Sequence, residues 1–223
     1  MEGKIIGTVA HAYLEKHVFG SDLDHTLLES VFSGFLGQQK ETMLLASPIL
    51  NRMKARVTEL LLRAITDRSL LELLEGVVQH SEVPFVLNRK QGYTFRGRID
   101  KLFQGRDNDE WGLIDWKTGS IDQRDPIEFA KEHYFDLQLA CYRFVVQELE
   151  YGRVGNMYLY FVSAGKLIEI NYEGNPGREI DEIIGFVERY RAEEVEIGRT
   201  VRQAKRKAGE CVQCPYFQMG VCS

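Results

Sequence analysis

The spacing of hydrophobic positions predicts helices in the first third of the chain. From residue 7 onward, apolar residues recur three and four positions apart, as in Ala10, Leu14 and Val18, and Gly7-Thr8 offers a helix start. Further helices are predicted over about 22–37, 48–66 and 68–75. Residues 7–75 are therefore expected to be mainly helical.

The hydrophobic period then changes from that of a helix to that of a strand. Strands are predicted over 82–88, 93–103 and 111–117, and a second pair over 156–162 and 166–172. One long helix over 126–150 separates the two groups, and a last helix covers 177–195. This order favours an α/β fold, a mixed sheet flanked by helices, in a single domain. Its expected parts are helices over 7–75, a core over 76–195, and a basic, cysteine-containing tail over 196–223.

The composition is that of an ordinary globular protein. Of the 223 residues, 44% are hydrophobic and 27% are charged, which excludes disordered and fibrous architectures. No apolar run approaches the roughly 20 residues of a membrane span. The start, Met1-Glu2-Gly3-Lys4, has no signal-peptide pattern. The expectation is a soluble, cytoplasmic protein without a membrane partner.

The net charge of −5 comes from 28 basic and 33 acidic residues, so the chain as a whole does not point to nucleic acid. Basic residues nevertheless gather in two places. The first cluster comprises Arg89, Lys90, Arg96, Arg98, Lys101 and Arg106, and the second Arg199, Arg202, Lys205, Arg206 and Lys207. Such runs are commonly solvated surface, so they permit a polyanionic partner without establishing one.

Two strand ends carry the residues with the clearest chemistry. In a strand, side chains two apart share a face, so Asp115 and Lys117 point one way while Ile114 and Trp116 point toward a core. Asp100 ends the neighbouring strand and can supply a second carboxylate to the same place. Two carboxylates, completed by water and phosphate oxygens, describe a Mg²⁺ site. Taken alone, the Asp-x-Lys triplet is a weak signal and fits an ordinary surface ion pair.

Other positions add to this pattern. Gln138 and Tyr142 lie four apart on the predicted long helix and therefore share a face. His11 lies at the border of the apolar stripe of the first helix, and Glu82 precedes Pro84. Each has an ordinary interpretation by itself, respectively helix packing, a histidine at the edge of the core, and an exposed strand residue.

Together these segments occur in an order that resembles a known family. Their order is 7–15, 82–85, 97–100, 114–119 and 138–142. It resembles the RecB-type branch of the PD-(D/E)XK nuclease superfamily, found at the C-termini of RecB- and AddA/AddB-type helicase–nucleases. The resemblance implies a restriction-endonuclease-like core and hydrolysis of DNA phosphodiester bonds with Mg²⁺ or Mn²⁺. It also implies an exonuclease of DNA repair and recombination, with a fused or associated ATP-dependent helicase.

The same resemblance implies a role for each matching residue. Asp100 and Asp115 would bind the divalent metal, with His11 and the main-chain carbonyl of Trp116 as further ligands. Lys117 would orient the attacking water or help to deprotonate it. The remaining candidates are Gln138 and Tyr142, which would position substrate and site, and Glu82, at an outer metal position. From the strand pattern itself, Arg96 and Arg98 share the face of Asp100 if the strand alternates regularly, so they are the expected DNA-binding residues.

The cysteines near the C-terminus extend the resemblance. Cys211, Cys214 and Cys222 resemble the terminal cysteine group of iron–sulfur members of this branch, which take another cysteine from upstream of the histidine motif. No cysteine precedes His11 here. Because a [4Fe–4S] cluster is normally held by four thiolates, a complete cluster is expected only in a longer parent protein, from which this chain would be an excised domain.

Two interpretations from other classes stay open. One is a non-catalytic, nuclease-like module that holds DNA, and the intact set Asp100, Asp115 and Lys117 favours an enzyme over it. The other is an interaction domain stabilised by zinc or an iron–sulfur group on the cysteine tail. Three clustered cysteines are one short of the four ligands of a structural zinc site, unless Cys141 or a histidine joins them.

Overall fold

A computed structural model describes residues 2–38, 47–89, 92–105, 110–121 and 124–192 of the chain. The chain divides into two units, residues 1–176 and 177–223. Among the described helices, none is both long and apolar enough to cross a membrane. The tail predicted over 196–223, with its basic cluster and its three cysteines, lies outside the described residues.

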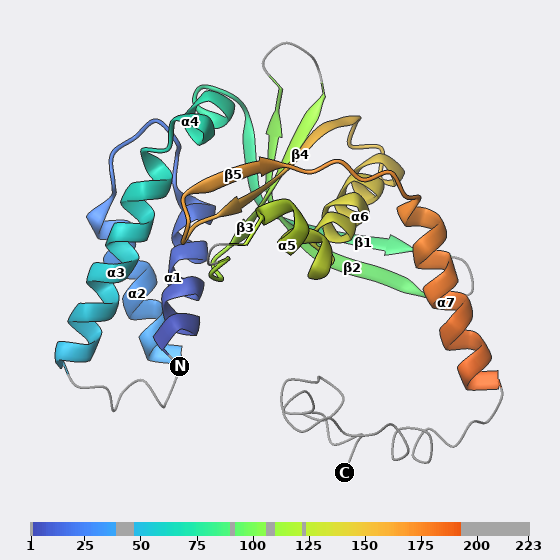
Figure 1. Ribbon diagram of the computed structural model, residues 1–223, viewed down its shortest axis with the longest axis horizontal. Coiled ribbons are helices and arrows are strands. Elements are labelled where there is room, and N and C mark those ends of the chain that lie inside the picture. Colours follow the sequence, from blue (N-terminus) through green and yellow to red (C-terminus); the bar gives the residue numbers. More distant parts are fainter. Residues whose placement is uncertain (1, 39–46, 90–91, 106–109, 122–123, 193–223) are drawn as a thin grey trace. The chain divides into compact units, whose positions relative to one another are not determined.

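The first unit contains four helices followed by an alternation of strands and helices (Figure 1). The four helices are α1 (Glu2–Lys16), α2 (His25–Gln38), α3 (Ser47–Ile65) and α4 (Arg68–Leu74). The strands are β1 (Gln79–Asn88), β2 (Thr94–Gln104), β3 (Trp111–Lys117), β4 (Val154–Phe161) and β5 (Lys166–Glu169). Between β3 and β4 lie α5 (Pro126–Glu132) and α6 (Phe135–Glu148). The second unit is described over most of α7 (Pro176–Ala192), on which Arg178 pairs with Glu182 one turn later at 2.8 Å.

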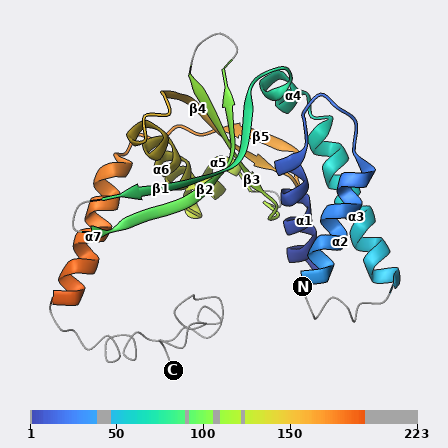
Figure 2. The ribbon, with the colours of Figure 1, turned by 180° about the vertical axis from the view of Figure 1, so that it is seen from behind.

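The five strands form one sheet in the order β1-β2-β3-β4-β5. Neighbouring strands are antiparallel except β3 and β4, which are parallel because α5 and α6 carry the chain across between them. Seen from behind, β1 and β2 form a long hairpin that runs beside α6 (Figure 2). The predicted α/β fold, a mixed sheet flanked by helices, is confirmed.

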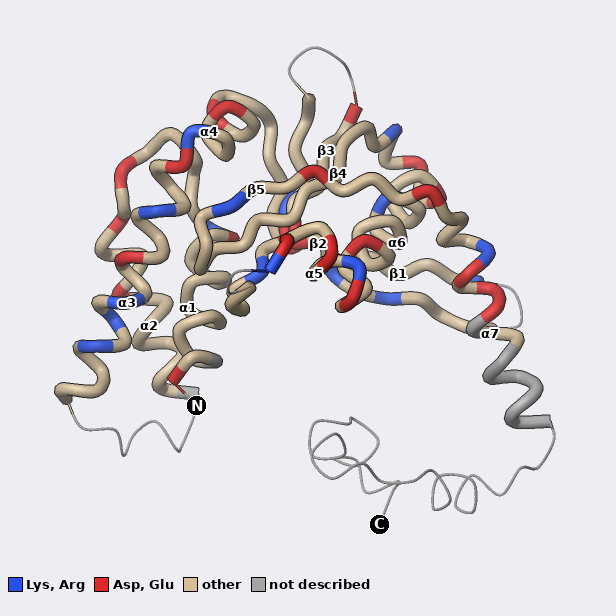
Figure 3. Tube along the Cα trace, viewed as in Figure 1, with Lys and Arg blue, Asp and Glu red and all other residues tan. Residues whose placement is uncertain are grey.

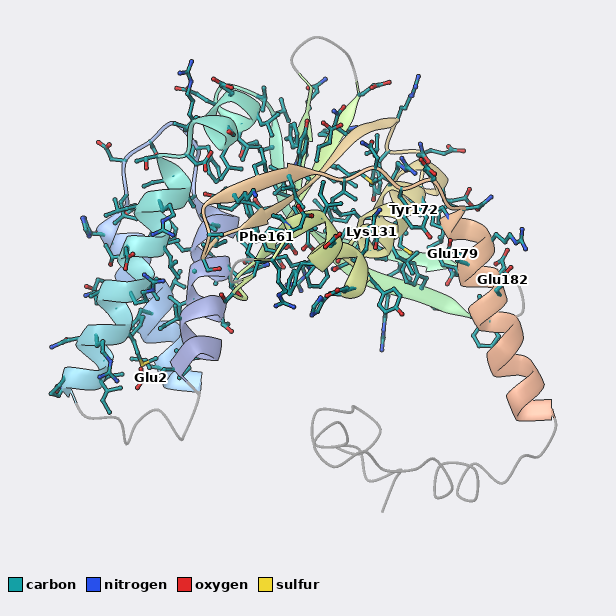
Figure 4. All side chains as sticks on the ribbon, in the orientation of Figure 1. Glu2, Lys131, Phe161, Tyr172, Glu179 and Glu182 are labelled. Atoms are coloured by element: carbon teal, nitrogen blue, oxygen red, sulfur yellow. The ribbon has the colours of Figure 1, made fainter. Side chains whose placement is uncertain are left out.

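Helices cover both faces of the sheet, and each face has its own hydrophobic core. Ile114 and Trp116 of β3 pack with α1, α2, α3 and α4 on one face, as the alternation of the strand predicted. Leu113, Leu159 and Phe161 pack with α5 and α6 on the other. Figure 4 shows the side chains on the ribbon, with Phe161 labelled. The strand β3 is therefore buried on both sides, and its last residues emerge between the two helical layers.

Two predicted helices differ from the observed ones. The helix α1 begins at Glu2 instead of near Gly7. Gly7 does not start the helix but lies inside it, at the point where α1 passes close to Thr118. The helix predicted over 126–150 is broken between α5 and α6, because Tyr134 adopts the left-handed backbone conformation (φ 57°, ψ 27°). No glycine or proline marks that break, so the hydrophobic pattern runs through it without a signal.

Candidate active site

The carboxylate of Asp115 lies buried at the end of β3 between a lysine and a glutamine. Its side chain is almost inaccessible, and the ammonium of Lys117 lies 2.6 Å from Oδ2. Gln138, on α6, donates from Nε2 to Asp115 Oδ1 at 3.1 Å. Lys117 Nζ in turn donates to Gln138 Oε1 at 2.8 Å. These contacts close a ring of three side chains, named here the Asp115–Lys117–Gln138 ring.

Burial makes this carboxylate hard to ionise. It raises the pKa of Asp115 to about 6, and the charge of Asp100 adds to the rise, while Lys117 opposes it. The Lys117 ammonium and the Gln138 amide compensate part of this cost, and a divalent cation beside Asp100 and Asp115 would compensate more.

Tyr142 extends the ring one helical turn along α6. Gln138 Nε2 lies 2.7 Å from the Tyr142 hydroxyl oxygen and donates to it, so the predicted common face of the two residues is confirmed. Burial raises the pKa of Tyr142 to about 12. The phenol therefore keeps its proton at neutral pH and acts as a hydrogen-bonding group, not as a base.

Asp100 stands beside this ring at the point where β2 and β3 part. The pairing of the two strands runs as far as Lys101 opposite Ile114, and Asp100 and Asp115 are the next residues on each strand. Asp100 Oδ2 accepts a hydrogen bond from the backbone N–H of Trp116 at 2.9 Å. The same oxygen lies 3.0 Å from His11 Nε2, so residues 89 positions apart in the chain meet here.

The other nitrogen of His11 contacts a residue that the sequence analysis missed. His11 Nδ1 lies 2.7 Å from Oε1 of Glu15, one turn later on α1. His11, Glu15 and Glu82 place one possible ligand atom each within 4.8 Å of one another. The i, i+4 spacing of His11 and Glu15 was visible in the sequence and is the signal that could have identified Glu15.

The charge state of this cluster follows from its crowded carboxylates. Burial lowers the pKa of His11, but hydrogen bonds to Asp100 and Glu15 outweigh it and raise the value to about 10. Burial also raises the pKa of Glu82, and the nearby Glu15 and Asp100 charges act in the same direction. In the metal-free protein, a proton on His11 thus holds the acidic side chains together.

These residues fit a divalent metal ion by the chemistry of their donor atoms. Ligand atoms of His11, Glu15 and Glu82 converge, and Asp100 adds a carboxylate oxygen 3.0 Å from His11. A proton or a divalent cation reduces the repulsion among these acidic groups. The Trp116 indole packs in the core between Phe19 and Tyr160, at ring distances of 5.9 and 5.8 Å. Metal ligation by the Trp116 carbonyl remains a proposal.

The first basic cluster does not form one patch. Lys101, expected among its surface residues, is 1% exposed and donates to Ser81 Oγ at 2.7 Å. It is buried because both faces of β2 are covered here. Ile99 and Leu102 pack on the α5–α6 side, and the Lys101 ammonium lies 5.7 Å from the centre of the Phe19 ring in the other core. Arg89 lies over the ring of Phe144 at 5.2 Å.

Two arginines of that cluster remain exposed. They are Arg96 and Arg98, of which Arg98 lies 2.7 Å from Glu82 at the border of the metal-binding candidates. Lys90 and Arg106 lie outside the described residues. Basic and acidic positions are interspersed along the described trace (Figure 3).

Comparisons with known proteins show the family to which the chain belongs. The family model of the PD-(D/E)XK nuclease superfamily matches residues 2–222. A search among curated proteins finds no match. A solved structure titled "Crystal structure of SSO0001" is 15% identical, with 99% of this chain and 84% of that chain covered and a TM-score of 0.39, at which the likeness carries no argument. Because the family model spans nearly the whole sequence, the chain belongs to the PD-(D/E)XK nuclease superfamily.

Proposed function

We propose that the protein is a metal-dependent deoxyribonuclease that hydrolyses phosphodiester bonds. The observation that carries the proposal is the Asp115–Lys117–Gln138 ring at the end of β3, with the His11–Asp100 pair beside it. Membership of a nuclease superfamily supports the reaction class. An ion pair on the surface, the ordinary interpretation of an Asp-x-Lys triplet, does not explain a carboxylate buried to this degree.

His11, Asp100 and Asp115 are the proposed ligands of Mg²⁺ or Mn²⁺, together with the main-chain carbonyl of Trp116. Glu15 is the proposed hydrogen-bond acceptor of the second nitrogen of His11. Glu82 is the proposed ligand of an outer metal position near these two residues. When bound, the metal would lower the pKa of a coordinated water and would place positive charge beside the scissile phosphate. The backbone N–H of Trp116 fixes one oxygen of Asp100 and thereby limits the orientations of this carboxylate.

Lys117 is the proposed donor to the attacking water or to the phosphate. Its ammonium is held by Asp115 and Gln138 and lies 4.0 Å from the centre of the Phe135 ring, so its position is fixed on three sides. Such fixed donors stabilise developing charge without reorganising during the reaction. Gln138 and Tyr142 are the proposed positioning residues of this ammonium and of the substrate.

Arg96 and Arg98 are the proposed contacts to the DNA backbone. Both are exposed on the β1–β2 hairpin, in the strand that leads to Asp100. Contacts to phosphates carry no sequence information, so the proposed cleavage is independent of base sequence.

The wider role rests on the resemblance to the RecB-type branch. It comprises exonuclease activity in DNA repair and recombination in the cytoplasm, an associated or fused ATP-dependent helicase, and a [4Fe–4S] cluster in a longer protein. For that cluster the proposed ligands of this chain are Cys211, Cys214 and Cys222, which lie outside the described residues.

The experiment that tests the function is incubation of the protein with end-labelled DNA in Mg²⁺, in Mn²⁺ and in EDTA. Linear and circular substrates, each single- and double-stranded, separate exonuclease from endonuclease activity. We expect cleavage of linear DNA that requires the metal and leaves closed circles intact. DNA that is bound but left uncut in both metals would contradict the proposal and support the non-catalytic module instead.

A further inference from the structure

An exposed aromatic side chain lies next to the proposed site, at the break between α5 and α6. Tyr134 is 71% exposed, the highest value among the large apolar side chains of the described residues. It directly precedes Phe135, whose ring lies 4.0 Å from Lys117 Nζ. Neighbouring Cα atoms are about 3.8 Å apart, so the backbone of Tyr134 lies close to that of Phe135, whose ring borders the proposed phosphate site.

The backbone that carries Tyr134 is fixed on both sides. The Tyr134 N–H donates to the Lys131 carbonyl at 3.1 Å, and its own carbonyl accepts the first hydrogen bond of α6 from the Gln138 N–H at 3.0 Å. The ring of the preceding residue, His133, is tilted against that of Phe129 with their centres 4.0 Å apart, and it lies 5.6 Å from the ring of Phe135. The corner is therefore anchored by aromatic packing, while Tyr134 itself projects into solvent.

The conformation and the exposure of Tyr134 both cost folding free energy. A left-handed backbone is unfavourable for a residue with a Cβ, and exposing a large aromatic ring forgoes the burial that such rings ordinarily provide. Residues held in such conformations gather at functional sites when the surrounding structure enforces them. Here the enforcing structure is the same helix start that places Gln138 in the Asp115–Lys117–Gln138 ring.

We propose that Tyr134 is a substrate-binding residue that stacks on an unpaired base next to the scissile phosphate. Bases offer their faces to aromatic side chains whatever their identity, so this contact requires no particular sequence. Inside a duplex both faces of a base are covered by its neighbours, so Tyr134 discriminates in favour of a single strand or a frayed end. The inference rests on the proposed function, since it takes the strand to be DNA positioned at Lys117.

Another exposed tyrosine provides a matched control. Tyr151 is 56% exposed, and its carbonyl accepts a hydrogen bond from Trp111 Nε1, at the first residue of β3. Lys117 is the last residue of the same strand. Loss of the Tyr151 ring therefore removes an exposed aromatic side chain without touching the site.

The test measures DNA binding in EDTA, where metal-dependent cleavage does not occur. The probes are a single-stranded oligonucleotide with 2-aminopurine near its end and a closed hairpin duplex of the same length. We expect Tyr134→Ala to weaken binding of the single strand about 5- to 150-fold, the range of one base–aromatic stack. Tyr134→Phe retains the affinity, since the ring remains, and Tyr151→Ala behaves as the wild type. The wild type quenches 2-aminopurine emission, whereas Tyr134→Ala does not, and duplex affinity changes little.

Thermal melting of each variant establishes that it is folded. Equal affinity of the wild type and Tyr134→Ala for the single strand would overturn the inference, as would an equal loss in Tyr151→Ala. Absence of cleavage in Mg²⁺ and Mn²⁺ would refute the proposed nuclease activity instead, and that outcome is read in a separate assay.

Discussion

At the scale of single residues, the contact of His11 with Glu15 gives the first prediction. A histidine that binds a metal through one nitrogen is ordinarily oriented by a carboxylate on the other, and loss of such a partner lowers metal affinity about 10- to 100-fold. His11 has this arrangement, with Nδ1 on Glu15 at 2.7 Å and Nε2 toward Asp100 at 3.0 Å. We therefore expect Glu15→Gln to weaken metal binding within that range.

Titration with Mn²⁺, followed by electron paramagnetic resonance, measures this affinity independently of catalysis. Co²⁺ absorption adds a signature of the ligand geometry, which a purely structural role of Glu15 would leave unchanged. The matched control is Glu72→Gln on α4, an exposed glutamate that also pairs with a neighbour one turn away. A Glu15→Gln affinity equal to that of the control would contradict the assigned role.

From the raised pKa of His11 we predict how the free energy of unfolding depends on pH when metal is absent. The histidine pKa rises from its ordinary 6.5 to about 10 in the folded protein, since the bonds to Asp100 and Glu15 outweigh burial. The folded state binds this proton more tightly, so its stabilising effect is complete below pH 6.5 and disappears as the pH rises toward 10. Lys101, whose pKa burial lowers to about 8, titrates in the same range with the opposite sign.

Comparison with a variant isolates the histidine from that lysine. In EDTA, we expect the melting temperature of the wild type to fall more steeply between pH 6.5 and 10 than that of His11→Gln. Saturating Mg²⁺ should reduce the difference, because the metal takes the place of the proton. Parallel curves for the two proteins in EDTA would show that His11 does not hold this proton.

Much of the residue-level site followed from spacing. The strand period placed Asp115 and Lys117 on one face, and the helical period did the same for Gln138 and Tyr142. Phe135 gave no comparable signal, because its contact with Lys117 depends on the break at Tyr134. Charge states could not be foreseen either, since they depend on burial by segments distant in the sequence.

At the scale of elements, the approach of α1 to the end of β3 depends on a glycine. A Cβ at Gly7 would lie 2.5 Å from Thr118 Oγ1 and 3.0 Å from Thr118 Cβ, so α1 or the turn after β3 has to move. Gly3, on the same helix, has open space around the corresponding position. Alanine is otherwise better than glycine in a helix by up to about 1 kcal/mol.

The two substitutions are therefore expected to act in opposite directions. Gly3→Ala should be neutral or stabilising, whereas Gly7→Ala should destabilise by about 1–3 kcal/mol, as overpacking does. Because α1 carries His11, Gly7→Ala should also weaken metal binding. Urea unfolding and Mn²⁺ titration of both variants measure the two effects, and equal stabilisation by both alanines would contradict the close contact.

The proposed phosphate contacts of the β1–β2 hairpin lead us to expect that DNA binding depends on salt. Each neutralised phosphate releases counterions, which gives a log–log slope of about −0.7 to −0.9 per contact. We expect Arg96→Glu and Arg98→Glu to weaken binding of all sequences alike and to make the slope shallower. Arg96 is the cleaner position, because Arg98 also pairs with Glu82.

The control is Arg68→Glu on α4, which is 92% exposed and lies on another element. Fluorescence anisotropy in EDTA, from low to high salt, measures the slope for each protein. An affinity that does not respond to salt, or that favours one base sequence, would contradict backbone contacts.

Elements were easier to predict from sequence than their irregularities. Both groups of strands and the helices between them followed from the change in period, whereas the break at Tyr134 lacked any glycine or proline. The irregularity of β1 at Glu82 was equally hidden, since this residue adopts a left-handed backbone (φ 51°) between the pairs of Ser81 and Val83 without being a glycine. Both irregularities adjoin the candidate site, where tertiary packing overrides the conformational preferences of the local sequence.

At the scale of the whole molecule, the order of elements was sufficient for the fold class but not for the sheet. A helical segment between two groups of strands is long enough for a parallel crossover, and β3 and β4 are joined in that way. The position of each strand in the order β1-β2-β3-β4-β5 depends on pairings that no local pattern specifies. The crossover brings α6 against the end of β3 and thereby completes the ring around Asp115.

The most direct test of the account measures cleavage and metal binding together in three proteins. Asp115→Asn should abolish DNA cleavage and weaken Mn²⁺ binding, and Asp100→Asn is expected to behave in the same way, because both carboxylates are proposed ligands. Lys117→Ala should abolish cleavage but retain most of the metal affinity, since the ammonium binds no cation. Circular dichroism establishes that each variant is folded. Measurable cleavage by Asp115→Asn at saturating Mg²⁺ would contradict the assignment of this site.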